Sequence, residues 1–173
     1  MPRSGLSISN GTPSAQVDWT WIQTLSPSAA SSATTTGTLP VYDMYMIRGF
    51  LIINQAGEAN ILARINGDTG ANYYNTYWNN LTPTTGAGES SVRVGTSRET
   101  RRTLFEIKLS GKTPATAGSF ITVNGFSGTE GGSSVLIGSE WQGGNAVQVT
   151  SLTFLPSAST MTGKIEIFGR NTL

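Results

Sequence analysis

The chain has 173 residues, of which 37% are hydrophobic and 12% are charged, and its formal net charge is +1. This length and composition predict one compact domain, which can bury roughly 68–70% of the surface of its unfolded chain. Cysteine and histidine are both absent, which excludes disulfides, thiolate and histidine metal sites, cysteine nucleophiles and a Ser-His-Asp triad.

The low charge also argues against the strong basic field that is typical of nucleic-acid-binding proteins. No run approaches the ~20 apolar residues of a membrane-spanning helix, and the N-terminus lacks the apolar core of a signal peptide. We therefore expect a soluble protein that is made in a cytoplasm and has no nucleic-acid or membrane partner.

Residues 1–16 are polar and contain glycine and proline, so we expect an N-terminal arm without a core of its own. Residues 17–173 are then a single domain. Its first segment, VDWTWIQTL, predicts a strand, one face of which carries Val17, Trp19, Trp21 and Leu25. The Ser/Thr/Ala-rich residues 26–40 follow, and they are either a flexible linker or, through SATTTGTL, a weak edge strand.

The run YDMYMIRGFLIIN, residues 42–54, is apolar on both faces after Arg48. It predicts a central strand that is covered on both sides, or a strand with one face against a neighbouring subunit. RTLFEIKLS and GKIEIFG alternate apolar with charged residues, as half-buried strands do. With NILARIN, SFITVNGF, SSVLIGSEW and AVQVTSLTFLP, eight or nine short strands alternate with Gly, Pro and Asn turn signals, which indicates an all-β sandwich or barrel.

The stretch from Asn66 to Gly70, NGDTG, contains oxygen atoms of the kind that calcium prefers. A calcium loop needs several acidic residues, whereas Asp68 stands alone here, and an Asn-Gly pair favours a tight turn. We therefore predict a turn. The ten acidic residues are scattered singly, so no carboxylate pair marks a glycosidase site, and we expect a protein that is not an enzyme and has no cofactor or metal.

Four aromatic residues lie within six positions: Tyr73, Tyr74, Tyr77 and Trp78. Alternate members, Tyr73 or Tyr74 together with Trp78, can belong to the core, the cluster can anchor a protein interface, or it can stack on a sugar. The segment LTPTTGAGES that follows is expected to be a short loop. The one basic cluster, Arg93, Arg98, Arg101 and Arg102, is either a solvated loop or a docking site for an acidic partner.

Three segments resemble the small jelly-roll structural proteins of tailed bacteriophages: YDMYMIRGFLII, LARINGDTGANY and AVQVTSLTFLPSASTMTGKIEIFG. The resemblance spans residues 42–169 and implies an antiparallel, jelly-roll-like β-sandwich, although an immunoglobulin-like topology has the same residue patterning. It also implies a virion protein, in most cases a head decoration (cement) protein that forms trimers on the capsid exterior. Its partners are then copies of itself and the major capsid protein, and assembly takes place in the host cytoplasm.

The alternative is a tail or spike module that binds glycan on the bacterial surface. For the decoration protein, the residues expected at a subunit or capsid interface are Trp19, Trp21, Tyr73, Tyr74, Tyr77, Trp78, Arg98, Arg101 and Arg102. Placement of Trp19 and Trp21 in the domain's own core fits the sequence equally well.

Overall fold

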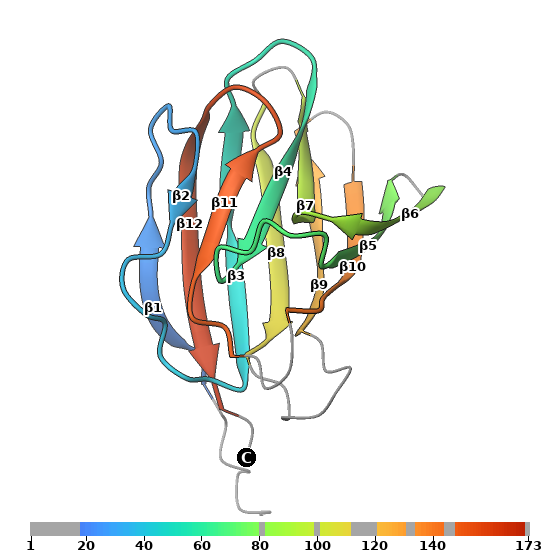
Figure 1. Ribbon diagram of the computed structural model, residues 1–173. Coiled ribbons are helices and arrows are strands. Elements are labelled where there is room, and N and C mark those ends of the chain that lie inside the picture. Colours follow the sequence, from blue (N-terminus) through green and yellow to red (C-terminus); the bar gives the residue numbers. More distant parts are fainter. Residues whose placement is uncertain are drawn as a thin grey trace, which may run out of the picture.

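The computed structural model describes residues 18–79, 82–98, 101–111, 121–130, 134–143 and 148–171, and the predicted arm of residues 1–16 lies outside them. The described residues form strands and no helix (Figure 1). The strands are β1 (Thr20–Leu25), β2 (Ala33–Thr34), β3 (Met44–Ile53), β4 (Glu58–Ile65), β5 (Tyr73–Asn79), β6 (Thr82–Glu89), β7 (Val92–Arg98), β8 (Thr103–Ser110), β9 (Ile121–Thr129), β10 (Ser134–Trp141), β11 (Leu152–Pro156) and β12 (Met161–Arg170).

The strands form two sheets that pack face to face. The larger sheet has eight strands in the order β1-β12-β3-β8-β9-β10-β5-β6, and the smaller has four in the order β2-β11-β4-β7. All neighbouring strands are antiparallel. The predicted all-β sandwich is therefore confirmed.

The winding of the chain distinguishes between the two topologies that the sequence left open. The first strand pairs with the last (β1 with β12), and moving inward along the chain, β2 pairs with β11, β3 with β8 and β4 with β7. Successive pairs alternate between the two sheets. This nesting of antiparallel pairs is the jelly-roll winding, which differs from that of an immunoglobulin domain.

Two hairpins are inserted into this winding. β5 and β6 lie between β4 and β7 in the sequence, and β9 and β10 lie between β8 and β11. Both hairpins add to the larger sheet beyond β8, so that sheet extends past the edge of the smaller one, on the right in Figure 1. β7 of the smaller sheet packs against β9, β10 and β5, so the inserted hairpins also bury residues in the core, among them Val123, Ile137 and Tyr73.

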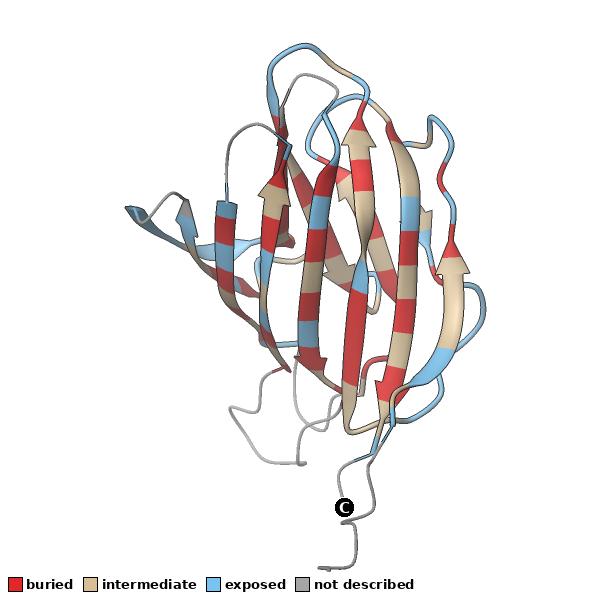
Figure 2. Cartoon of the chain, turned by 180° about the vertical axis from the view of Figure 1, so that it is seen from behind, coloured by how far each residue is buried: buried red, intermediate tan, exposed pale blue. Residues whose placement is uncertain are grey.

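The core fills the space between the two sheets, and its residues follow the alternation that the sequence predicts. In β8, Phe105, Ile107 and Leu109 point inward and are buried, whereas the residues between them face outward. β12 buries Ile165 and Ile167 in the same way. Figure 2 shows this banding of buried and more exposed residues along the strands of the larger sheet. β3 lies between β12 and β8, as expected of a central strand. Its outer face is not fully covered, because Arg48 is exposed and Phe50 lines an open hollow, and a neighbouring subunit at this face stays a prediction.

The predicted face of the first strand is wrong, and a β-bulge is the reason. Trp21 pairs with Phe168 and Gln23 with Ile167, so Ile22 is an extra residue without a partner. One extra residue exchanges the two faces of a strand. Leu25 therefore points into the core, while Trp21 points outward and is 59% exposed. Trp19 is half-buried. The alternative that placed both tryptophans in the domain's own core is therefore also wrong.

Two segments whose sequences show little strand pattern form strands at sheet edges. SATTTGTL contributes β2, a strand of only two residues that pairs with β11. LTPTTGAGES, predicted to be a loop, instead contains β6. Pro83, Gly86 and Gly88 have little strand propensity, but an edge strand bonds on one side only and tolerates them.

Candidate functional site

The aromatic segment is divided between the two faces of β5. Tyr73 points inward and is fully buried, which confirms for this residue the core alternative. Tyr77 points to the same side but lies farther along the strand, where it is partly buried and packs against the core. Tyr74 and Trp78 point to the opposite, outer face, and each is about 40% exposed, so the alternative that placed Trp78 in the core is wrong. The four rings therefore do not form one continuous platform.

Tyr73 belongs to a structural joint rather than to a surface. Its hydroxyl accepts a hydrogen bond from the Ile65 amide at 2.9 Å and lies 3.2 Å from the Asp68 carbonyl oxygen. Its ring stacks on Trp141 with the ring centroids 6.3 Å apart. Burial raises the pKa of Tyr73 to about 12, because the phenolate would have to lose its hydration.

Asp68 completes this joint as an acceptor of hydrogen bonds. Its carboxylate accepts from Trp141 Nε1 at 2.6 Å, from Asn72 Nδ2 at 2.9 Å and from the Gly70 amide at 2.7 Å. Burial acts to raise the pKa of Asp68, but these three donors together outweigh it and lower the pKa below its ordinary value. Both carboxylate oxygens are thus engaged by N–H groups, which makes this a structural carboxylate.

The predicted turn is present at Asn66 and Gly67, where φ is 55° and 69°. The Asp68 amide donates to the Ile65 carbonyl at 3.0 Å and closes the turn. The turn does not make a hairpin, because β4 and β5 belong to different sheets. The side chain of Asn66 holds the segment before β11: its Oδ1 accepts from the Thr150 amide at 2.7 Å, and its Nδ2 donates to the Gln148 carbonyl at 2.7 Å.

The outer face of the larger sheet carries large exposed apolar side chains on four adjacent strands. We define the outer patch as Trp78 of β5, Leu136 of β10, Phe126 of β9 and Leu104 of β8, which are 39–58% exposed. Leu136 is the direct cross-strand partner of both Trp78 and Phe126. If each side chain has a surface of roughly 200 Å² and about half of it is free, the four together expose about 400 Å². Exposed apolar patches of this size are often functional.

Charged residues border the outer patch on the side of β3 and β12. Glu166 accepts from Lys164 Nζ at 2.7 Å and lies 3.3 Å from Arg48 Nε. The hydrogen bond from Lys164 and the bond from Arg48 lower the pKa of Glu166. Between these charges and the patch is an open hollow of about 380 Å³, whose apolar lining includes Phe50, Leu104 and Phe126.

The structure divides the basic cluster of the sequence. Arg101 and Arg102 are exposed at the start of β8, and the Arg102 guanidinium lies 4.7 Å from the ring centroid of Phe50, beside the hollow. The side chain of Arg98 lies outside the described residues. Arg93 is not part of this group, because it lies in a groove beside β5 and β6.

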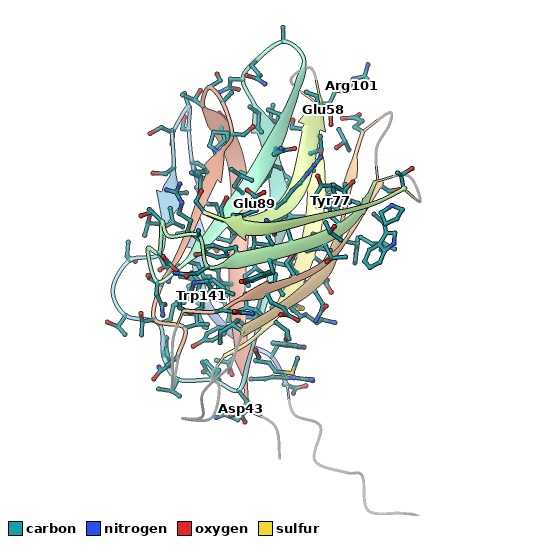
Figure 3. The ribbon with its side chains drawn as sticks, turned by 45° about the vertical axis from the view of Figure 1, so that its right-hand side comes forward. Asp43, Glu58, Tyr77, Glu89, Arg101 and Trp141 are labelled. Atoms are coloured by element: carbon teal, nitrogen blue, oxygen red, sulfur yellow. The ribbon has the colours of Figure 1, made fainter. Side chains whose placement is uncertain are left out.

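That groove is the second candidate site. It has a volume of about 310 Å³ and is lined mainly by polar residues of β4, β5, β6 and β7, among them Asn60, Tyr77, Thr85, Glu89 and Arg93. Arg93 lies over the Tyr77 ring at 4.3 Å from its centroid and donates to Thr96 Oγ1. Figure 3 looks onto the β5–β6 hairpin and labels Tyr77 and Glu89 on its two strands. We call it the hairpin groove.

Trp19 and Trp21 lie at the opposite edge of the larger sheet, on β1 and just before it. The Arg170 guanidinium lies 4.7 Å from the Trp19 ring centroid. Trp21 Nε1 is 3.4 Å from Thr24 Oγ1, and most of its ring is exposed. These two tryptophans lie apart from the outer patch, because β12 and β3, with Arg48, Lys164 and Glu166, come between β1 and β8.

No group of three or more His, Cys, Asp or Glu side chains comes together among the residues that the structure describes. Within the same ranges, no helix is long and apolar enough to cross a membrane. In comparisons with known proteins, no family model matches the chain, and no curated protein is significantly similar to it.

Proposed function

We propose that the protein is a structural component of a bacteriophage virion: a head decoration protein that binds the capsid shell as a homo-oligomer, with a trimer expected from the family resemblance. It has no catalytic role in this proposal. The observation that carries the proposal is the outer patch, which leaves Trp78, Leu104, Phe126 and Leu136 exposed on neighbouring strands of the larger sheet.

Three further features support this function. The jelly-roll winding is common among viral capsid proteins, and it agrees with the resemblance of residues 42–169. The patch has an apolar centre with the charged residues Arg102, Arg48, Lys164, Glu106 and Glu166 beside it, which suits a partner surface with an apolar ridge and a charged rim. The net charge of +1 causes little repulsion when many copies are packed on one shell.

The proposed mechanism is mechanical. The patch of about 400 Å² supplies around half of one side of an interface of standard size, which is about 800 Å² per partner. Its burial is worth roughly 10 kcal/mol before the entropic cost of association is subtracted. Contacts repeated by an oligomer over symmetric shell sites then add avidity, and a protein that bridges shell subunits raises the barrier to their separation.

The test is binding of the purified protein to empty expanded heads. We expect saturable binding at a fixed number of copies per head, and we expect Phe126→Ser with Leu136→Ser to weaken it by at least ~10-fold. Val41→Ser, which removes an apolar side chain of similar exposure outside the patch, is the matched control and should bind as the wild type does. Absence of saturable binding would reject the decoration function.

One observation favours a second candidate, a tail or spike module that recognises bacterial glycan. The hairpin groove is concave and polar and contains one aromatic ring, which is the character of a ligand site rather than of a flat protein contact. A tail protein would present this groove outward and use the outer patch for attachment to its neighbours. Labelling of assembled particles with an antibody against the protein distinguishes the two locations.

A further inference from the structure

The hairpin groove is built from segments that the fold brings together from three places in the sequence. β4 contributes Asn60 from its outward face, β7 contributes Arg93, and the β5–β6 hairpin contributes Tyr77, Thr84, Thr85 and Glu89. β5 and β6 belong to the larger sheet, whereas β4 and β7 belong to the smaller one. The hairpin therefore forms one wall of the groove and the outer surface of the smaller sheet forms the other.

Several polar groups in the groove have no partner within the described part of the chain. The side-chain amide of Asn60, the hydroxyls of Thr84 and Thr85 and the carboxylate of Glu89 make no hydrogen bond or ion pair there. Asn75, by contrast, is buried and both polar atoms of its side chain are engaged, because it donates to the Ser91 carbonyl at 2.8 Å and accepts from the Arg93 amide at 3.3 Å. The groove thus has a fixed floor and free donors and acceptors above it.

The charges in the groove indicate which ligand it can take. Arg93 is the one cation in the lining, and it is already engaged by the Tyr77 ring, by Thr96 and by Glu58 at 3.8 Å. Glu89 in the same lining opposes an anion such as phosphate. A single carboxylate is too few for a calcium site, and the density of polar groups is unfavourable for an apolar ligand.

A neutral polyhydroxyl compound meets these conditions. Its hydroxyls act as both donors and acceptors, which matches amide, hydroxyl and carboxylate partners, and its C–H groups can pack against the edge of the Tyr77 ring, over which the Arg93 guanidinium lies. A volume of about 310 Å³ has room for one or two sugar rings. We propose that the hairpin groove is a saccharide-binding site, with Asn60, Thr84, Thr85 and Glu89 as hydrogen-bonding residues and Tyr77 as the aromatic contact.

This site is separate from the outer patch, because Tyr77 and Trp78 point to opposite sides of β5. Saccharide binding therefore does not depend on the decoration function and can accompany either location in a virion. It would give the particle weak contacts to glycan, which many copies would strengthen together.

The probes for the test are the methyl glycosides of glucose, galactose, mannose, rhamnose and N-acetylglucosamine, each added to isotope-labelled full-length protein. We expect at least one of them to shift the backbone amide NMR signals of Asn60, Tyr77, Thr85 and Glu89 in a saturable way. Asn60→Ala and Glu89→Gln should each weaken that binding by about 3- to 10-fold, as the loss of one hydrogen bond does. Neither residue contributes to the buried core, so both variants should fold.

Asn124→Ala is the matched control, since it removes the same amide from an exposed site on β9. It should leave binding unchanged, as should the patch variant Leu136→Ser. The proposal is overturned if no glycoside of the panel binds, if binding shifts signals elsewhere, or if Asn60→Ala and Glu89→Gln bind as tightly as the control. Among these outcomes, shifts confined to the outer face would assign sugar contact to Trp78 and Tyr74 instead.

Discussion

At the scale of single residues, the fold depends on a few side chains that connect distant segments. Asp68 connects its own turn to Trp141, which lies 73 positions later in the chain. Asn66 connects the same turn to residues 148–151. Both residues belong to the NGDTG stretch, where each residue type has a structural reason. The Asn-Gly pair adopts the positive φ of the turn, and the aspartate accepts the hydrogen bonds that hold the turn to Trp141.

Asp68→Ala should therefore lower the free energy of unfolding. Its carboxylate accepts three hydrogen bonds, and the indole N–H of the buried Trp141 would lose its acceptor. A hydrogen bond to a charged group contributes about 1.5–3 kcal/mol, so we expect a loss of about 2–3 kcal/mol in urea denaturation. A loss below about 0.5 kcal/mol would contradict a structural role.

The lowered pKa of Asp68 also predicts a dependence on pH. A carboxyl group with a folded-state pKa below its ordinary value stabilises the fold above that ordinary value, and this contribution is lost as the pH falls through the folded-state pKa. The stability of the wild type should thus decrease below about pH 4. Asp68→Asn should lose less stability over the same range, and equal pH slopes for the two proteins would contradict this account.

Tyr73 predicts a dependence on pH at the alkaline end. Burial raises its pKa to about 12, and the folded state therefore holds the phenol proton more tightly than the unfolded state does. The resulting contribution to stability is complete below pH 10 and is lost between about pH 10 and pH 12. Denaturation of Tyr73→Phe over this range should show a shallower decrease than that of the wild type, and an identical decrease would contradict the assignment.

Gly49 and Gly128 offer a matched pair of glycine-to-alanine changes in the same sheet. A Cβ at Gly49 would lie 2.1 Å from the Lys164 carbonyl oxygen on β12, whereas a Cβ at Gly128 would meet no atom within 4 Å. We expect Gly49→Ala to cost more than about 2 kcal/mol of stability, because a backbone strand must shift, and Gly128→Ala to change it by less than about 0.5 kcal/mol. Thermal unfolding of both variants checks this, and equal effects would contradict the close approach of β3 and β12.

At the scale of elements, the accuracy of the sequence predictions depended on how strongly burial constrains a strand. β8 and β12 have one buried face each, so their alternation was readable in RTLFEIKLS and GKIEIFG. In β1 the bulge at Ile22 changes the face, and nothing in VDWTWIQTL marks an extra residue. β6 is exposed along almost its whole length, so no apolar pattern was available to predict it.

The two candidate sites were only partly predictable for a related reason. Tyr74 and Trp78 were interface candidates in the sequence, with the core as an open alternative, but Leu104, Phe126 and Leu136 look like ordinary strand residues until the register places them side by side. The hairpin groove was not predictable at all. Its walls come from β4, β7 and an inserted hairpin, and only the pairing of strands shows that these segments meet.

The β5–β6 hairpin should be less protected than the centre of the same sheet. β6 is an edge strand and bonds to β5 alone, whereas β3 has partners on both sides. Amide hydrogen exchange should thus be faster in β6 than in β3, at least for the amides that point away from β5. Equal protection in the isolated protein would mean that a second copy covers this edge.

At the scale of the whole molecule, the protein is a jelly roll whose larger sheet is extended by two hairpins. The nested pairs form most of both sheets, and the hairpins add core residues such as Tyr73, Val123 and Ile137 as well as area on the outer face. One side of this extension carries the outer patch, and the other side borders the hairpin groove. In the proposed account, the added strands supply most of the outer patch and one wall of the hairpin groove, and they share the core with the nested strands.

The central claim is that the outer patch is buried against the capsid shell, and single-cysteine protection tests it most directly. The natural chain has no cysteine, so Leu136→Cys and Val41→Cys each introduce one exposed thiol, inside and outside the patch. The account predicts that both thiols react with a maleimide in the free protein, and that only Leu136→Cys becomes protected when the protein is bound to expanded heads. Equal reactivity of both thiols in the bound state would contradict it.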